Sequence, residues 1–129
     1  MPGTVENLKG LRILVAEDEM LILLDIENML SEIGCEIVGP VATVDAALAM
    51  IRGNSFDGAL LDMSLHGERI TPAAEALLAR GVPYVLCTGY GRESRDEAAI
   101  ANAPRLTKPF TQECLRAAMR EAFTATAKA

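Results

Sequence analysis

Hydrophobic and polar positions along the chain follow two different periods. Short aliphatic or β-branched runs, typical of buried strands, occur at 11–16, 36–41, 59–61, 83–87 and 105–107. Between these runs, apolar residues recur every three or four positions, which predicts helices. In the first helix these positions are Leu23, Ile26, Leu30 and Ile33. Gly34 is expected to end that helix.

Capping residues mark the starts of the other predicted helices, at Thr43, Thr71, Ser94 and Thr111. The helix after Thr43 should run to about Arg52, and the one after Thr71 should close at Gly81. Five strands alternating with five helices predict βαβ units, and therefore an α/β fold with a doubly wound parallel sheet. Gly39-Pro40 interrupts the second strand, which suits an edge position.

Polar residues that directly follow the predicted strands are the functional candidates, because open parallel sheets bind ligands at the carboxyl ends of their strands. They are Glu17, Asp18 and Glu19, then Asp62, Thr88 and Lys108. Clustered carboxylates raise one another's pKa unless a cation lies among them. Oxygen ligands without His or Cys favour a hard ion, and a few carboxylates with water suit Mg²⁺.

A carboxylate can also act as a nucleophile toward a phosphoryl group and form an acyl phosphate. Asp62 is the best candidate, because it closes the central predicted strand. Glu17 and Asp18 would then hold the Mg²⁺, while Thr88 and Lys108 would contact the phosphoryl oxygens.

Composition narrows the class of protein. The chain has 129 residues, 50% of them hydrophobic, and a formal net charge of −6. We expect a single domain over 1–129 with its core at about 11–123. The acidic balance argues against nucleic acid as a partner, and the lack of a long apolar run or polybasic cluster argues against a membrane. Three widely spaced cysteines indicate a reduced, cytoplasmic protein in which they act as small hydrophobes.

From about Leu11 to Phe123 the sequence resembles the receiver domain of two-component response regulators. The matching segments are 13–19, 59–65, 86–89 and 107–110. The resemblance implies a flavodoxin-like five-stranded parallel sheet of order 2-1-3-4-5 with five helices. It implies that Asp62 accepts a phosphoryl group from a sensor histidine kinase or histidine phosphotransfer protein. It further implies that Glu17, Asp18, Asp62 and the Ser64 backbone carbonyl bind Mg²⁺, and that the Lys108-Pro109 bond is cis.

One position departs from the family pattern. Receivers usually carry an aromatic residue three positions before the lysine, where this chain has Arg105. The segment 88–91 resembles part of the motif F-A-T-G-(apolar)-Y of a subgroup frequent in alphaproteobacteria. We therefore predict a non-standard switch formed by Thr88, Tyr90 and Arg105. The alternative, that Tyr90 is only a half-buried cap on the crevice, remains open.

The function expected from the sequence is that of a stand-alone phosphoacceptor receiver, a monomer or weak dimer rather than an enzyme. Its output would be binding to a downstream protein partner or phosphoryl relay. In related receivers the first helix meets the kinase or phosphotransfer protein. One alternative is a pseudo-receiver that serves as a scaffold. Another is an Asp-nucleophile phosphatase, which Ser64 disfavours, because dehalogenase-type enzymes carry an acid two residues after the nucleophile.

Overall fold

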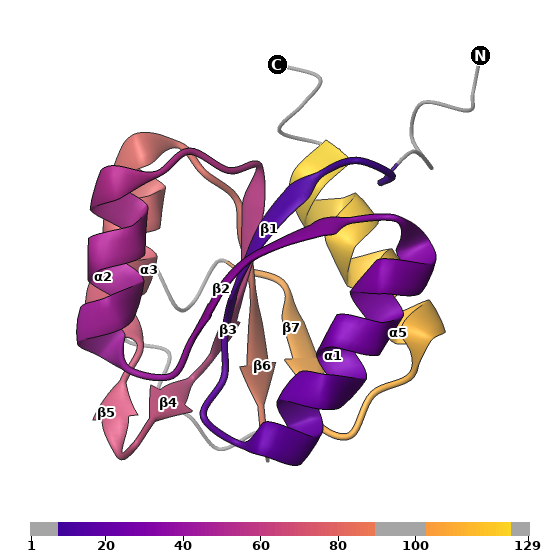
Figure 1. Ribbon diagram of the computed structural model, residues 1–129, viewed down its shortest axis with the longest axis horizontal. Helices are drawn as coiled ribbons and strands as arrows, with labels where there is room; N and C mark the ends of the chain where they lie inside the picture. The colour runs from indigo at the N-terminus through magenta and orange to yellow at the C-terminus, as the bar shows by residue number, and fades with distance from the viewer. Residues whose placement is uncertain (1–7, 90–102, 125–129) are drawn as a thin grey trace.

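The computed structural model describes residues 8–89 and 103–124, and its centre is a five-stranded parallel sheet (Figure 1). The strand order is β2-β1-β3-β6-β7, which in chain order is the expected 2-1-3-4-5. The strands are β1 (Arg12–Ala16), β2 (Glu36–Val41), β3 (Gly58–Asp62), β6 (Tyr84–Thr88) and β7 (Arg105–Thr107). All neighbouring pairs are parallel, so the carboxyl ends of the strands share one edge of the sheet.

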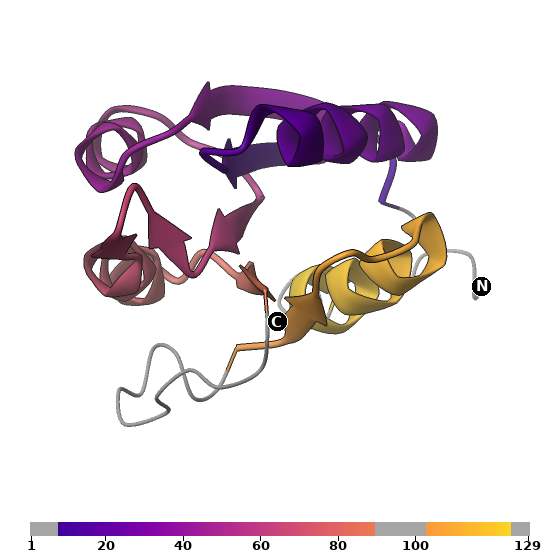
Figure 2. The same ribbon diagram turned by 90° about the horizontal axis from the view of Figure 1, so that it is seen from below.

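Helices cover both faces of the sheet. The helices are α1 (Met20–Ile33), α2 (Val44–Gly53), α3 (Thr71–Arg80) and α5 (Gln112–Met119), and α5 continues into the π-helical η2 (Arg120–Thr124). Figures 1 and 2 show α1 and α5 on one face and α2 and α3 on the other. The predicted helix at Ser94 lies outside the described residues. No helix in the described ranges is long and apolar enough to cross a membrane.

Local capping explains most helix boundaries. Gly34 ends α1 with a left-handed φ of 101°, a conformation that glycine adopts without steric cost. Thr43 and Thr111 cap α2 and α5 by accepting hydrogen bonds from the backbone N–H groups of Ala46 and Cys114. The prediction that Thr71 caps α3 is wrong.

The α3 helix instead includes Thr71 as its first residue, and the preceding residue, Ile70, makes no side-chain cap. Ile70 is fully buried, and its N–H donates to the Met63 carbonyl at 2.9 Å. The chain is therefore already fixed at Ile70 before the helix begins.

The central strand β3 is buried at all five positions. Ala59 and Leu61 pack in the cluster beneath α2 and α3, whereas Leu60 packs in the cluster beneath α1 and α5. Because both faces of the sheet are covered, its strands consist of nearly continuous hydrophobic runs rather than an alternating pattern. Asp62, the last residue of β3, therefore lies at the boundary between the core and the end of the sheet where the strands stop.

The three cysteines do not share one environment. Cys87 is fully buried in β6, where burial raises its pKa to about 12, and Cys35 is partly buried. Cys114 is exposed, so the expectation that all three cysteines act as small hydrophobes is wrong for this one. It lies in the first turn of α5, at the margin of the buried stripe formed by Leu115, Ala118 and Met119.

The strand β2 lies at an edge of the sheet, as Gly39-Pro40 predicts. Between the pairs Leu14–Val38 and Ala16–Val41, the register shifts by one residue, so β2 bulges beside β1. Pro40 falls in this bulge, where its missing N–H removes no bond from a regular ladder.

One element was not predicted from the sequence. The segment after β3 forms a two-stranded antiparallel hairpin of β4 (Ser64–Leu65) and β5 (Glu68–Arg69). In Figure 1 this hairpin lies at the end of the molecule toward which the sheet strands point.

The close approach of Gly58 and Phe123 gives a test of the packing. A Cβ at Gly58 would lie 2.6 Å from Cε1 of the buried Phe123 ring. Gly58→Ala should therefore lower the free energy of unfolding, measured by urea denaturation, by about 1–3 kcal/mol. Gly53→Ala is the control, because a Cβ there meets nothing within 4 Å. A Gly58→Ala variant as stable as the wild type would contradict the packing described.

Candidate functional site

The acidic residues that follow β1 and β3 form one cluster. Glu17, Asp18 and Asp62 each place a carboxylate oxygen within 4.8 Å of the others. The cluster lies at the carboxyl ends of adjacent strands, because β1 pairs with β3 in parallel. The arrangement expected from the spacing of these acids is thus present in the structure.

Lys108 brings a positive charge into the cluster. Its Nζ donates to Asp62 Oδ2 at 3.0 Å and lies 3.1 Å from Glu17 Oε1. Burial disfavours the charged ammonium, but the hydrogen bond to Asp62 and the negative charges of Asp62 and Glu17 outweigh that cost and raise the pKa of Lys108. The ammonium is therefore held in its charged form between two carboxylates.

Glu17 is the most deeply buried acid, with a side chain only 1% exposed. Its Oε2 accepts a hydrogen bond from the Glu19 N–H at 3.0 Å. Its Oε1 forms the ion pair with Lys108 but has no contact of good hydrogen-bond geometry. Burial raises the pKa of Glu17, and the nearby charge of Asp62 adds to the effect. A second cation near Oε1 would stabilise this carboxylate, and the all-oxygen donor set of the cluster fits Mg²⁺.

Asp18 is held by the β4–β5 hairpin. Its Oδ2 accepts a hydrogen bond from the backbone N–H of His66 at 2.8 Å, and the His66 ring lies farther away, with Nδ1 at 3.9 Å. The N–H of Ser64, the first hairpin residue, lies 3.4 Å from Asp62 Oδ1. Neither this contact nor the hairpin was predicted from the sequence. The sequence feature that could have indicated the hairpin is the His66-Gly67 pair, since two-residue hairpin turns often have glycine as their second residue.

The other predicted site residues lie close by or outside the described ranges. Thr88 is buried at the end of β6, and its carbonyl accepts a hydrogen bond from the Lys108 N–H at 2.7 Å. The Arg105 guanidinium reaches Met63, with Nη1 3.8 Å from the sulfur. The Lys108-Pro109 bond is cis, as the family resemblance implies. Tyr90 lies outside the described residues.

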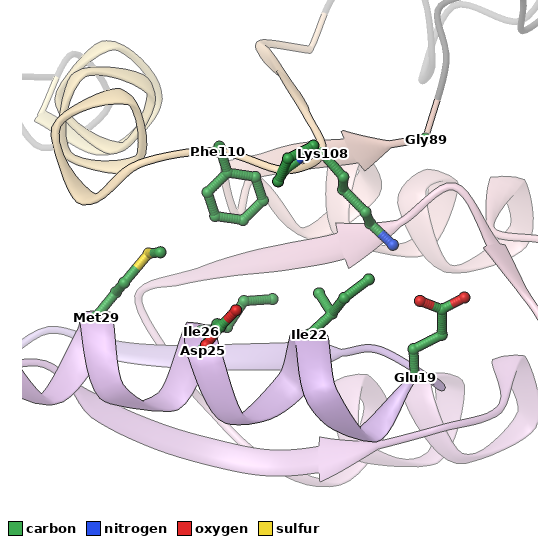
Figure 3. Close-up of a pocket in the computed structure, with 9 residues that line it drawn as sticks. Glu19, Ile22, Asp25, Ile26, Met29, Gly89, Lys108 and Phe110 are labelled. Atoms are coloured by element: carbon green, nitrogen blue, oxygen red, sulfur yellow. The ribbon is translucent and has the colours of Figure 1, made fainter.

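A cavity of about 410 Å³ adjoins the cluster, between α1 and the segment that connects β7 to α5. Figure 3 shows Ile22 and Met29 of α1 on one side and Phe110 on the other, with the Lys108 ammonium directed toward α1. Beyond the cavity, the start of α1 exposes the large apolar side chains of Met20, Leu21 and Leu24. The acidic site is therefore bordered by an apolar surface.

Comparison with known proteins identifies the family. The profile of the response regulator receiver domain matches residues 13–120. The transcriptional regulatory protein PdtaR of Mycobacterium tuberculosis is 33% identical over 106 residues, which are 78% of this chain and 50% of PdtaR. The chain thus spans about half the length of the curated relatives it matches.

Two solved structures share the fold over nearly their whole length. SdrG from Sphingomonas melonis Fr1 is 37% identical and has a TM-score of 0.76, covering 93% of this chain and 98% of SdrG. The receiver domain of the sensor histidine kinase PA1611 from Pseudomonas aeruginosa PAO1 has a magnesium ion coordinated in its active site cleft. It is 26% identical with a TM-score of 0.73, covering 86% of this chain and 96% of that domain. Together with the parallel sheet and the acidic cluster at its edge, the profile match shows that this chain belongs to the response regulator receiver domain family.

Proposed function

We propose that residues 1–129 act as a single receiver domain that accepts a phosphoryl group on Asp62 in a two-component phosphorelay. The observation that carries the proposal is the contact of Asp62 Oδ2 with Lys108 Nζ at 3.0 Å, beside the carboxylates of Glu17 and Asp18. This arrangement supports the proposal, because a carboxylate oxygen, an ammonium and two further carboxylates meet where the strands end.

The reaction would be an in-line transfer from phosphohistidine. An oxygen of the Asp62 carboxylate attacks phosphorus, the new O–P bond forms as the P–N bond breaks, and the departing imidazole takes up a proton. Lys108 would contact a phosphoryl oxygen, because its ammonium already touches the attacking carboxylate. The Thr88 hydroxyl would contact a second phosphoryl oxygen.

The residues proposed to hold Mg²⁺ are Glu17, Asp18, Asp62 and the backbone carbonyl of Ser64. When bound, the ion would neutralise charge on the phosphoryl oxygens during transfer. Support comes from the buried Glu17 Oε1, from the all-oxygen donor set, and from the magnesium in the related PA1611 receiver domain. The residues present therefore fit the ion.

The response to phosphorylation would pass through Thr88, Tyr90 and Arg105. An arginine cannot reproduce the rotation of a buried aromatic ring, but the Arg105 side chain already reaches Met63, the neighbour of Asp62. This contact connects the edge strand β7 with the residue next to the phosphoacceptor. The switch at these three positions stays a prediction.

The proposed partners are proteins. A histidine kinase or histidine phosphotransfer protein would dock on the exposed apolar start of α1 to reach Asp62, and the output would be binding of a downstream protein or phosphoryl relay. The excess of acidic residues disfavours nucleic acid as a partner. We expect the domain to act in the cytoplasm as a monomer or weak dimer.

Charge repulsion within the acidic cluster can be tested with Asp18→Asn. Removing one of three close carboxylates should raise the free energy of unfolding in EDTA by on the order of 1 kcal/mol. The same variant should lose most of the stabilisation that Mg²⁺ gives the wild type. Urea denaturation with and without Mg²⁺ measures both effects, and Glu121→Gln, at an exposed acid of η2, serves as the control. Lower stability of Asp18→Asn in EDTA would argue against repulsion.

Phosphorylation can be tested with acetyl phosphate and Mg²⁺. Intact mass spectrometry should show one added phosphoryl group on the wild type and none on Asp62→Asn, because the amide is not a nucleophile. Asp45→Asn, at an exposed residue of α2, should still be labelled. A wild type that takes up no phosphoryl group would favour the pseudo-receiver scaffold. Steady turnover of p-nitrophenyl phosphate would favour the phosphatase.

Docking on α1 predicts a difference between protein and small-molecule donors. Leu21→Ser removes an apolar side chain that is 78% exposed, so it should leave labelling by acetyl phosphate unchanged. It should slow transfer from a phosphorylated histidine phosphotransfer protein that reacts with the wild type. Leu78→Ser, at an exposed leucine of α3 on the other face of the sheet, is the matched control. Equal slowing by both variants would exclude specific docking on α1.

A further inference from the structure

We propose that the β4–β5 hairpin orients Asp18 for Mg²⁺, so that His66 and Gly67 are positioning residues of the metal site. The proposal rests on the magnesium site proposed above. It assigns a role to two turn residues that the predicted ligand set does not include.

The first observation is the direct attachment of the hairpin to the acidic cluster. The N–H of His66, 48 positions away in the sequence, donates to Asp18 Oδ2 at 2.8 Å. A carboxylate held through one oxygen cannot rotate freely, so its position beside Glu17 and Asp62 is fixed before any cation arrives. Hydrogen bonds of this kind from outside the ligand set commonly orient metal ligands.

The second observation is the conformation of the turn. The pairs Ser64–Arg69 and Leu65–Glu68 leave a two-residue loop with φ values of 50° at His66 and 82° at Gly67. Positive φ at both central residues defines a type I′ turn, which strongly prefers Asn-Gly. Within the part of the chain that the structure describes, His66 is the only residue other than glycine with positive φ. Histidine tolerates this region better than most side chains do.

The third observation separates the roles of backbone and side chain. Leu65 and Ile70, on either side of the turn, are fully buried, and the N–H of Ile70 donates to the Met63 carbonyl at 2.9 Å. The base of the hairpin is thus anchored in the core. The His66 side chain is 60% exposed and its ring makes no short contact with Asp18. The position therefore depends on a residue that accepts positive φ, and the imidazole itself is replaceable.

These observations predict that substitutions at the two turn positions change the affinity for Mg²⁺ in opposite directions. His66→Asn creates the Asn-Gly pair that type I′ turns favour, so Mg²⁺ affinity should be kept or increased. His66→Val and Gly67→Ala place a side chain in an unfavourable left-handed conformation and should weaken binding. A Cβ at Gly67 meets no atom within 4 Å, so the effect of Gly67→Ala would arise from the backbone alone.

Gly81→Ala is the matched control. Gly81 also has a positive φ, 72°, and a Cβ there also meets nothing within 4 Å. It ends α3 just before the amino end of β6, whereas the acidic cluster lies at the carboxyl ends of the strands. Gly81→Ala should lower stability through the same backbone strain without changing the affinity for Mg²⁺.

The experiment is a Mg²⁺ titration of each variant, followed through the amide NMR signals of Asp18 and Ser64, with the free energy of unfolding measured in urea. His66→Val and Gly67→Ala should raise the Kd for Mg²⁺ by about tenfold, the lower range for loss of a partner that orients a metal ligand. Gly81→Ala should bind Mg²⁺ with the affinity of the wild type. His66→Asn should bind it with the same or a higher affinity.

Two outcomes would overturn the proposal in different ways. Wild-type affinity in Gly67→Ala and His66→Val, or an equal loss in Gly81→Ala, would reject the hairpin's role and leave the metal site standing. Absence of Mg²⁺ binding by the wild type would reject the metal site, and the hairpin's role with it.

Discussion

The site depends on one buried interaction, the placement of the Lys108 ammonium between the carboxylates of Asp62 and Glu17. Burying like charges together is costly unless an opposite charge accompanies them. Here the cation comes from the segment after β7, whereas the acids follow β1 and β3. The same contacts that keep the lysine charged also link the segments that follow three strands of the sheet. The ionic site therefore joins parts of the chain that are far apart in the sequence.

The fold accounts for the position of this charge cluster. Helices on both faces make the sheet interior apolar, so polar groups collect where the strands stop. Since β1 and β3 are neighbours at the centre of the sheet, the chain passes to opposite faces after them, which opens a crevice there. The crevice adjoins the cavity beside α1, because Lys108 contacts Asp62 and also lines that cavity.

Periodicity and capping were sufficient to predict the parallel sheet, and the family resemblance implied its strand order. The positions of Glu17, Asp18, Asp62 and Lys108 after predicted strands were sufficient to predict that they converge. These features follow from local patterns and from the rule that parallel strands end together. The hairpin was not predicted, because two-residue strands carry too few positions to show a period. The exposure of Cys114 was also not predicted, because a small apolar residue at the margin of the buried helix face can be either buried or exposed. The contact of Glu17 with Lys108 is a tertiary detail that sequence spacing does not contain.

The edge strand β2 has a consequence for the behaviour of the protein in solution. A regular, hydrophobic edge strand offers unpaired N–H and C=O groups to any other chain, which favours aggregation. In β2 the bulge opposite β1 disturbs the regular spacing of those groups, and Pro40 lacks one donor altogether. The charged side chain of Glu36 is also exposed there. This border of the sheet is thus a poor template for strand addition, which disfavours intermolecular β-sheets between copies of the chain.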